Sequence, residues 1–502
     1  MPRFASLFPI AAVCALCCPP ATAADETAPP ECVLDEIEHL YEDLILELPR
    51  VRPLCEELGL HGERVDIGGC ALYCEQEGEG RPLVLLHGGP GSTHHLFHPQ
   101  FSRAAQWARV IYYDQRGCGR SDYKSEGPYS IGQAVDDLDA LRAALGIERW
   151  VVVGSSYGGT LAQCYAAKYP ERLLGLVLIG SASSGLPVSS LGDRQHQFMT
   201  RAECERVSAI FSDDSLTTEQ AVFNAHLNGD WKRQSFYRPT IEELARLARY
   251  EWKHDSRFRG QIAGSLQTVD LEGVFDRYPL PILMMDGKWD LTWGAEKSAT
   301  MHACFPDAEL VVFDRAGHCP YIDMPDAFFS KLKAFVDALP PPSDEAITLW
   351  KRRQAALQRE KEQDPAYLVR MSGYGAESSK KLAARYSKDW LRQLDDPGAL
   401  IRLGFALYDA ADYAAALPVF KKAAVCAPFG STQYAIATIW QGHMLDLLGE
   451  RDQAIAAYNK AAATGITHTI GHDQYALTYS PVEYAAQRLQ TPFTRIENTW
   501  QE

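Results

Sequence analysis

The sequence predicts a doubly wound α/β sheet that is interrupted by a helical insertion and followed by an all-α region. From about residue 64, short apolar runs alternate with helical stretches, as in parallel strands that are buried on both faces. The alternation stops over 186–278 and resumes at 281. Beyond three prolines at 340–342 the chain is helical, and part of it repeats. A chain of 502 residues also exceeds the ~150 residues of an average domain, so several parts are expected.

The composition is that of a globular protein with an acidic surface. Hydrophobic residues make up 46% of the chain and charged residues 23%, close to globular averages. The formal net charge is −16, which repels phosphate backbones, so no nucleic acid partner is expected. After the N-terminus no apolar run approaches the ~20 residues that a membrane helix needs.

The N-terminus has the pattern of a secretory signal peptide over residues 1–23. A single basic residue, Arg3, precedes an apolar stretch, and a small-residue triplet ends at Ala23. This order predicts export, with cleavage near Ala23. The alternatives are a buried apolar helix or a lipid anchor on Cys17 or Cys18.

The next parts are an acidic helical segment over 24–63 and a sheet core in two pieces, 64–185 and 279–338. Helices are expected between the strands, for example over 133–145 and 158–168. The clearest predicted strands are Pro82–Leu86, Val110–Asp114, Trp150–Gly154, Leu176–Gly180, Pro281–Met285 and Leu310–Asp314.

The insertion at 186–278 is polar and helical in pattern, and it separates two strands of one sheet. Doubly wound sheets bind their ligands outside the carboxyl ends of the strands. We therefore expect the insertion to form a lid over that edge.

The C-terminal part divides into linker and helices over 339–395 and a repeat region over 396–502. Eight positions recur in the same order and spacing. They are Gly404, Leu407, Ala416, Leu417, Phe420, Lys422, Ala423 and Ala424, matched by Gly442, Leu445, Ala454, Ile455, Tyr458, Lys460, Ala461 and Ala462. The first copy follows the tetratricopeptide pattern, and flanking helices are expected to cap the repeats. An ordinary pair of helical hairpins is the alternative.

The strongest local signal for chemistry is Gly154-Ser155-Ser156-Tyr157-Gly158, between an apolar strand and a helix. This context is that of a nucleophile elbow, in which a strained turn exposes the central hydroxyl. Only Ser156 has a glycine two residues away on both sides, so Ser156 rather than Ser155 is the candidate nucleophile.

A serine nucleophile needs a histidine base and an acid that orients it. In this type of fold the chain order is serine, acid, histidine. Asp290 lies past the predicted strand 281–285 and is the first candidate acid, with Asp286 as the second. His318 follows the strand 310–314 and is the candidate base.

The developing oxyanion needs two backbone N–H donors. Tyr157, at the start of the helix after the nucleophile, supplies one, and the glycine-rich loop 87–91 supplies the other, with Gly89 as the candidate. The clustered histidines His94, His95 and His98 show no convincing acidic partners in the sequence. We expect surface or supporting roles for them, no metal site and no cofactor.

Together these residues resemble the α/β-hydrolase superfamily and, more narrowly, the proline iminopeptidases of peptidase family S33. The matching motifs are HGGPG at 87–91, YDQRGCGRS at 113–121 and GSSYGGTLA at 154–162. The resemblance covers about 65–338 and leaves the repeat outside. It implies Ser156, Asp290 and His318 as the triad and Gly89 and Tyr157 as the oxyanion donors.

The resemblance also implies carboxylates that hold the free α-amino group of the substrate. Some members carry an acid directly after the triad aspartate, whereas this chain has Leu291. Substitutes are available in the predicted lid. Glu251 is the first candidate because Tyr250 and Trp252 flank it, and Glu242 and Glu243 are the others.

The sequence thus predicts an exported serine hydrolase that removes N-terminal residues from short peptides. A carboxylesterase or lipase with the same triad is the first alternative, since a fold does not fix a substrate. A binding protein that uses the hydrolase fold as a scaffold is the second. The repeat region is expected to offer a surface to a protein partner; the oligomeric state is left open.

Overall fold

The computed structural model describes residues 59–124, 128–181, 253–266, 269–290, 301–372, 376–467, 470–471 and 478–496. It divides into two compact units, 1–354 and 355–502. The predicted signal peptide, most of the segment 24–63, and the larger part of the predicted lid lie outside the described residues. Among the described residues, no helix is long and apolar enough to span a membrane.

The first unit is built on an eight-stranded sheet with the order β1-β2-β4-β3-β5-β6-β7-β8. Strands β1, β2 and β4 pair antiparallel, and β4 and the strands that follow it in the sheet pair parallel. The strands are β1 Glu63–Asp66, β2 Ala71–Glu77, β3 Arg81–Leu86, β4 Ala108–Tyr113, β5 Trp150–Ser155, β6 Leu173–Ile179, β7 Ile282–Gly287 and β8 Glu309–Phe313.

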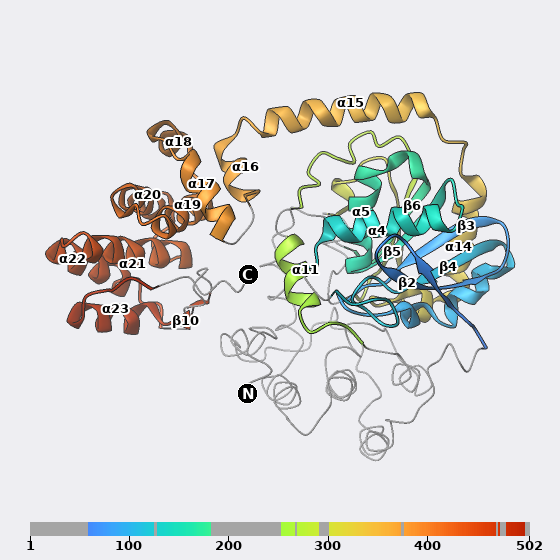
Figure 1. The fold of residues 1–502 in the computed structure, drawn as a ribbon, viewed down its shortest axis with the longest axis horizontal. Helices are drawn as coiled ribbons and strands as arrows, with labels where there is room; N and C mark the ends of the chain where they lie inside the picture. The colour runs from blue at the N-terminus through green and yellow to red at the C-terminus, as the bar shows by residue number, and fades with distance from the viewer. Residues whose placement is uncertain are drawn as a thin grey trace, which may run out of the picture. The chain divides into compact units, whose positions relative to one another are not determined.

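Helices cover both faces of this sheet, because alternate strand residues point to opposite sides. Val84 and Val152 pack on one side with α4 and α5 (Figure 1), and Leu83 and Val151 pack on the other with α14. The helical elements of this unit are η3 His94–Phe97, η4 Gln100–Gln106, α4 Ile131–Ala144, α5 Tyr157–Lys168, η5 Pro170–Arg172, α11 Phe258–Leu266, α13 Pro320–Asp323, α14 Pro325–Ala338 and α15 Asp344–Lys361, which crosses the boundary between the units.

The predicted α/β fold is confirmed, with two differences in detail. An antiparallel pair, β1 and β2, extends the sheet beyond the six predicted strands. The predicted strand at Leu310–Asp314 is not buried on both faces, since Val312 in β8 is 41% exposed. An apolar run does not show from its sequence whether another element packs on each of its two faces.

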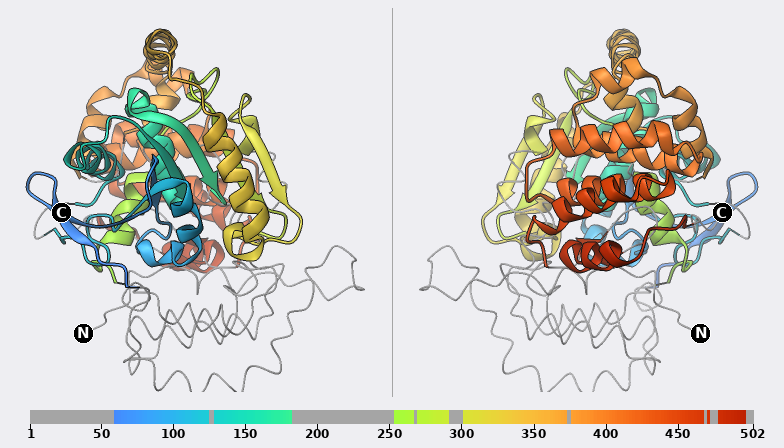
Figure 2. Two further views of the ribbon diagram at one scale, coloured as in Figure 1. Left: turned by 90° about the vertical axis from the view of Figure 1, so that its right-hand side faces the viewer. Right: turned by 90° about the vertical axis from the view of Figure 1, so that its left-hand side faces the viewer.

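The second unit is helical and has its own apolar core. Successive helices pack on one another in chain order, from α19 to α22 (Figure 2). Its elements are α16 Pro365–Arg370, α17 Ala376–Arg385, α18 Lys388–Gln393, α19 Pro397–Asp409, α20 Tyr413–Cys426, α21 Thr432–Leu447, α22 Arg451–Ala462, β9 Ile470–Gly471, β10 Thr478–Tyr479 and α23 Pro481–Gln490.

The repeat seen in the sequence corresponds to two equivalent helix contacts. A Cβ at Gly404 of α19 would lie 2.6 Å from the ring of Phe420 in α20. Likewise, a Cβ at Gly442 of α21 would overlap the ring of Tyr458 in α22. Each glycine therefore lets one helix of a pair close on the aromatic ring of the other. The tetratricopeptide assignment itself stays a prediction.

Candidate active site

Ser156 lies at the turn between β5 and α5, in a backbone conformation that L-residues rarely adopt. Its φ is 55° and its ψ is −123°. A Cβ at Gly154 would overlap the carbonyl oxygen of Gly158, and one at Gly158 would overlap that of Leu86. Both glycines are thus needed for the turn to form at all. Strained residues of this kind gather at functional sites.

The neighbouring serine has a different environment. Ser155 is the last residue of β5 and is buried, and its hydroxyl has no hydrogen-bond partner among the described residues. Ser156 is only partly buried. The structure therefore places Ser156, and not Ser155, at the exposed point of the turn.

His318 and Asp290 form a buried pair at the same edge of the sheet. They follow β8 and β7, and His318 Nδ1 lies 2.7 Å from Asp290 Oδ2. Burial acts to lower the pKa of His318, but the charge and hydrogen bond of Asp290 outweigh it and raise that pKa above its ordinary value of 6.5. Asp290 is therefore placed to orient the imidazole and to stabilise its protonated form.

The second candidate acid, Asp286, has another contact. Its Oδ1 accepts a hydrogen bond of 3.0 Å from the backbone N–H of Gly180, the residue after β6. Asp286 therefore anchors the end of a strand, whereas Asp290 is in direct contact with the ring of His318.

The end of β6 connects the serine turn to the histidine. The backbone N–H of Ser156 donates to Ile179 O at 2.9 Å. A Cβ at the next residue, Gly180, would lie 2.9 Å from His318 Nδ1 and 3.2 Å from Asp290 Oδ2. Gly180 thus leaves the space that the His318–Asp290 pair occupies. Its sequence signal was only a glycine after an apolar run, which many turns share.

The HGGPG loop after β3 lies directly against the serine turn. A Cβ at Gly88 would be 3.0 Å from both Ser155 O and Ser156 Cβ. Gly89 has a φ of 112°, and the Gly89–Pro90 peptide is cis. On the other side of Ser156, Tyr157 is the first residue of α5, where N–H groups have no partner within the helix.

A neutral histidine, His87, holds this loop in place, and sequence reasoning did not identify that role. The backbone N–H of Gln115 donates to His87 Nε2 at 3.1 Å, so Nε2 is an acceptor and the proton is on Nδ1. That nitrogen lies 3.2 Å from Gly88 O. Burial lowers the pKa of His87 to about 4, so the ring stays neutral and keeps this tautomer near pH 7. His87 thereby ties the HGGPG loop to the YDQRGCGRS loop.

The segment 253–266, where the predicted lid returns to the core, packs on both loops. The backbone N–H of Asp255 donates to Gly117 O at 2.8 Å. A Cβ at Gly91 would lie 3.1 Å from the ring of His254 and 3.2 Å from the side chain of Arg259. The described end of the insertion thus lies at the carboxyl edge. Glu242, Glu243, Glu251 and Leu291 lie outside the described residues.

The expectation that the histidine cluster lacks acidic partners was wrong. His94 Nδ1 lies 2.8 Å from Asp114 Oδ1, and His98 Nε2 lies 3.1 Å from Glu75 Oε2. Burial acts to raise the pKa of Asp114, but the charge and hydrogen bond of His94 lower it to about 2. The acids come from β2 and from the loop after β4, so only the folded sheet brings them to the histidines.

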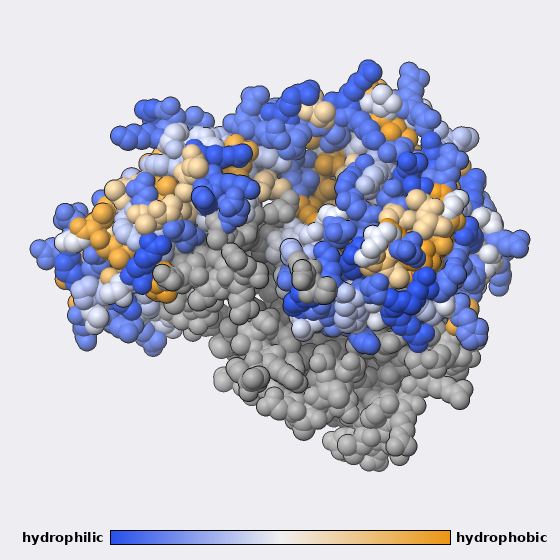
Figure 3. Space-filling view, viewed as in Figure 1, coloured by the Kyte–Doolittle hydropathy of each residue, from blue (hydrophilic) through white to orange (hydrophobic). Residues whose placement is uncertain are grey.

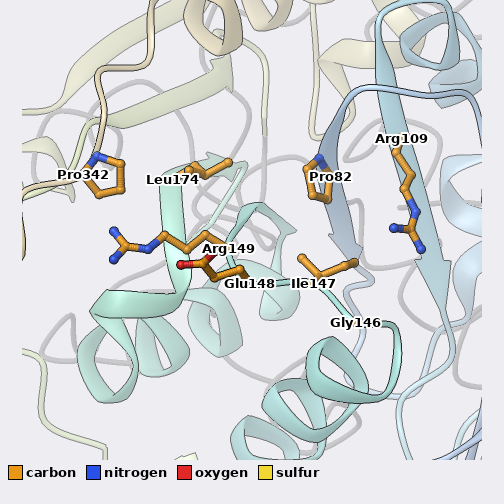
Figure 4. Close-up of a pocket in the computed structure, with 8 residues that line it drawn as sticks. All are labelled: Pro82, Arg109, Gly146, Ile147, Glu148, Arg149, Leu174 and Pro342. Atoms are coloured by element: carbon orange, nitrogen blue, oxygen red, sulfur yellow. The ribbon is translucent and has the colours of Figure 1, made fainter.

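A surface hollow of about 540 Å³ lies elsewhere in the first unit (Figure 4). Its lining residues include Pro82, Arg109 and Leu174, near the amino ends of β3, β4 and β6. The Ser156 turn and the His318–Asp290 pair follow carboxyl ends of strands. The hollow is therefore separate from the candidate active site.

Comparison with known proteins agrees with this fold. A family model described as the alpha/beta hydrolase fold matches residues 81–325. The proline iminopeptidase of Saccharolobus solfataricus is 28% identical over 272 residues, which are 52% of this chain and 86% of that protein. The proline iminopeptidase of Neisseria gonorrhoeae is 30% identical over 283 residues, covering 50% of this chain and 87% of that one. A 2-hydroxymuconate semialdehyde hydrolase of Pseudomonas putida is 27% identical over 286 residues, which are 55% of this chain and 94% of that protein.

The chain is therefore a hydrolase and belongs to the α/β-hydrolase superfamily. Within that superfamily it is an S33-like protein, homologous to the proline iminopeptidases. These matches cover about half of the chain, and the second unit is outside the region that the family model matches.

Proposed function

We propose that this protein is a serine aminopeptidase of proline iminopeptidase type, which releases N-terminal residues from short peptides. The observation that carries the proposal is the buried His318–Asp290 pair, placed beside the strained Ser156 turn by the end of β6. The names of the relatives from S. solfataricus and N. gonorrhoeae support the peptide substrate.

In the proposed mechanism Ser156 attacks the scissile carbonyl carbon, and His318 Nε2 accepts the hydroxyl proton. Asp290 holds the proton of His318 on Nδ1, so that Nε2 acts as the base. The backbone N–H groups of Gly89 and Tyr157 stabilise the tetrahedral oxyanion. His318 then protonates the leaving amine, and water hydrolyses the acyl-enzyme by the same route in reverse.

Selection of an N-terminal residue needs a group that recognises the free α-ammonium ion. A desolvated cation without a partner is costly, and we propose Glu251 as its carboxylate partner, on the evidence of the sequence alone. Export through the N-terminal segment is likewise proposed from the sequence.

The test compares prolyl-naphthylamide, its N-acetyl form and a short-chain nitrophenyl ester. Acetylation removes the charge, so kcat/KM should fall by ~10²-fold or more. Glu251→Gln should lower turnover of the free-amine substrate and spare the ester. Equal cleavage of the acetylated form would exclude an exopeptidase. A general esterase or an endopeptidase would then replace it.

We further propose that the second unit binds a protein partner. Apolar side chains reach the surface of this unit (Figure 3), and among them Val425 is 84% and Phe429 68% exposed. Substituting both with serine should abolish capture of that partner and leave hydrolysis unchanged.

A further inference from the structure

Three donor side chains converge inside the first unit, outside the candidate active site. Glu75 belongs to β2, while His94 begins η3 and His98 directly follows it. All three are buried, and their donor atoms lie within 4.8 Å of one another. In the sequence Glu75 is far from the histidines, but β2 pairs with β4 (Figure 1), and the loop after β4 contacts η3.

The spacing of the donor atoms fits a small metal ion. His94 Nε2 lies 3.3 Å from Glu75 Oε1, and His98 Nε2 lies 3.1 Å from Glu75 Oε2. Zinc bonds to nitrogen and oxygen are about 2.0–2.2 Å long, so neighbouring ligands of a tetrahedral ion are about 3.3 Å apart. These two distances run to different oxygens of Glu75, and the donor atoms as a set lie within 4.8 Å of one another, so the three side chains would draw together to share one ion.

Further contacts orient the donors as in known metal sites. Asp114 Oδ1 accepts hydrogen bonds from His94 Nδ1 at 2.8 Å and from the backbone N–H of the same residue at 2.9 Å. A carboxylate that takes the far ring proton of a histidine directs the lone pair of the other nitrogen toward a metal. The hydroxyl of Tyr73 donates to Glu75 Oε1 at 2.7 Å. His98 is held by stacking on Tyr112, with ring centroids 4.1 Å apart.

The charges in this cluster also favour a cation. Two buried carboxyl groups, those of Glu75 and Asp114, lie on either side of the His94 ring. A proton shared through His94 supplies one positive charge, whereas a divalent ion supplies two. Buried charges are costly unless they are paired, so the ion is the better match for two carboxylates.

We propose that Glu75, His94 and His98 bind one Zn²⁺ ion, with Asp114 orienting His94. Two imidazole nitrogens and one carboxylate oxygen are donors typical of zinc. Three protein ligands leave the fourth position of the ion to a water molecule, and because none of the three belongs to the proposed triad or oxyanion donors we assign the ion a structural role. It joins β2 to the chain that follows the HGGPG loop and thereby supports the position of Gly89.

The test measures metal in the full-length protein after growth with added zinc and dialysis. Close to one zinc per chain is expected by elemental analysis. Glu75→Gln and His98→Gln should lose it, whereas the control His61→Gln, which changes an exposed histidine, should keep it. Asp114→Asn should weaken zinc binding by about 10–100-fold, the usual effect of losing such a supporting carboxylate.

A second measurement does not depend on the folding of any variant. Cobalt(II) added to the metal-free wild-type protein should give the visible absorption of a tetrahedral ion, and zinc should abolish it. The proposal is overturned if the wild-type protein retains no zinc and shows no cobalt absorption. It is equally overturned if both Glu75→Gln and His98→Gln retain zinc at the level of His61→Gln.

Discussion

The two units of this protein use glycine for different purposes. In the first unit, Gly154, Gly158 and Gly180 make room for one strained turn and one buried pair, and none of these contacts recurs among the residues that the structure describes. In the second unit, Gly404 and Gly442 make the same contact with an aromatic ring in two successive helix pairs. A unique site depends on contacts between distant segments, whereas a repeat depends on neighbours in the chain. Substitutions should therefore affect chemistry in the first unit and stability in the second.

The largest expected effect is that of Ser156→Ala. Removing the nucleophile of a triad lowers kcat by about 10⁶-fold, while the unfolding transition should not change. Ser155→Ala is the matched control, because its hydroxyl makes no hydrogen bond among the described residues. Steady-state kinetics and thermal unfolding of both variants test this. Equal losses of activity would remove Ser156 from its proposed role.

The next effect is that of Asp290→Asn, which leaves the shape of the site intact but disturbs the tautomer of His318. A loss of about 10⁴-fold in kcat is expected for such a change. Asp286→Asn should cost far less, since an amide oxygen can still accept the hydrogen bond from Gly180. If Asp286→Asn were the more damaging change in kcat, the two acids would have to exchange roles.

In the second unit, Gly404→Ala should destabilise the fold and spare the chemistry. The added methyl group meets the Phe420 ring at 2.6 Å, and such overpacking costs about 1–3 kcal/mol. The control is Gly132→Ala in α4, where nothing lies within 4 Å and alanine should stabilise the helix by up to about 1 kcal/mol. Denaturant unfolding measures the free energy of unfolding of both variants. A loss of kcat in Gly404→Ala would show that the units are not independent in function.

The smallest expected effect is the loss of activity as the pH is lowered and His318 becomes protonated. Only neutral His318 can accept a proton, and Asp290 raises its pKa above 6.5. Activity should therefore fall as the pH decreases, with a midpoint above 6.5. Folding raises the pKa of His318, so the His318–Asp290 pair stabilises the folded protein at pH values below the pKa that this histidine has in the unfolded chain. This stabilisation is lost as the pH rises through the pKa of the folded state. NMR titration of His318 checks the direction, and Asp290→Asn should move the pKa down. A midpoint below 6.5 in the wild-type protein would contradict the contact with Asp290.

The strands, the serine turn and the candidate acid and base could be predicted because their signals are local. Apolar runs mark β3 to β7, and the glycines around Ser156 are adjacent to it in the chain. Contacts between distant segments could not be predicted. Glu75 meets His98 only because β2 pairs with β4, and Gly180 borders His318 only because β6 lies next to β7. The exposed face of β8 was also missed, because packing on a strand's face depends on distant segments.

Covalent labelling tests most directly whether Ser156 is an activated nucleophile. A fluorophosphonate reacts with a serine that a neighbouring histidine activates, and peptide mass spectrometry then locates the label. We expect stoichiometric labelling of Ser156 in the wild-type protein and strongly reduced labelling in His318→Gln. Labelling of Ser155 instead, or no labelling of the folded wild-type protein, would contradict it.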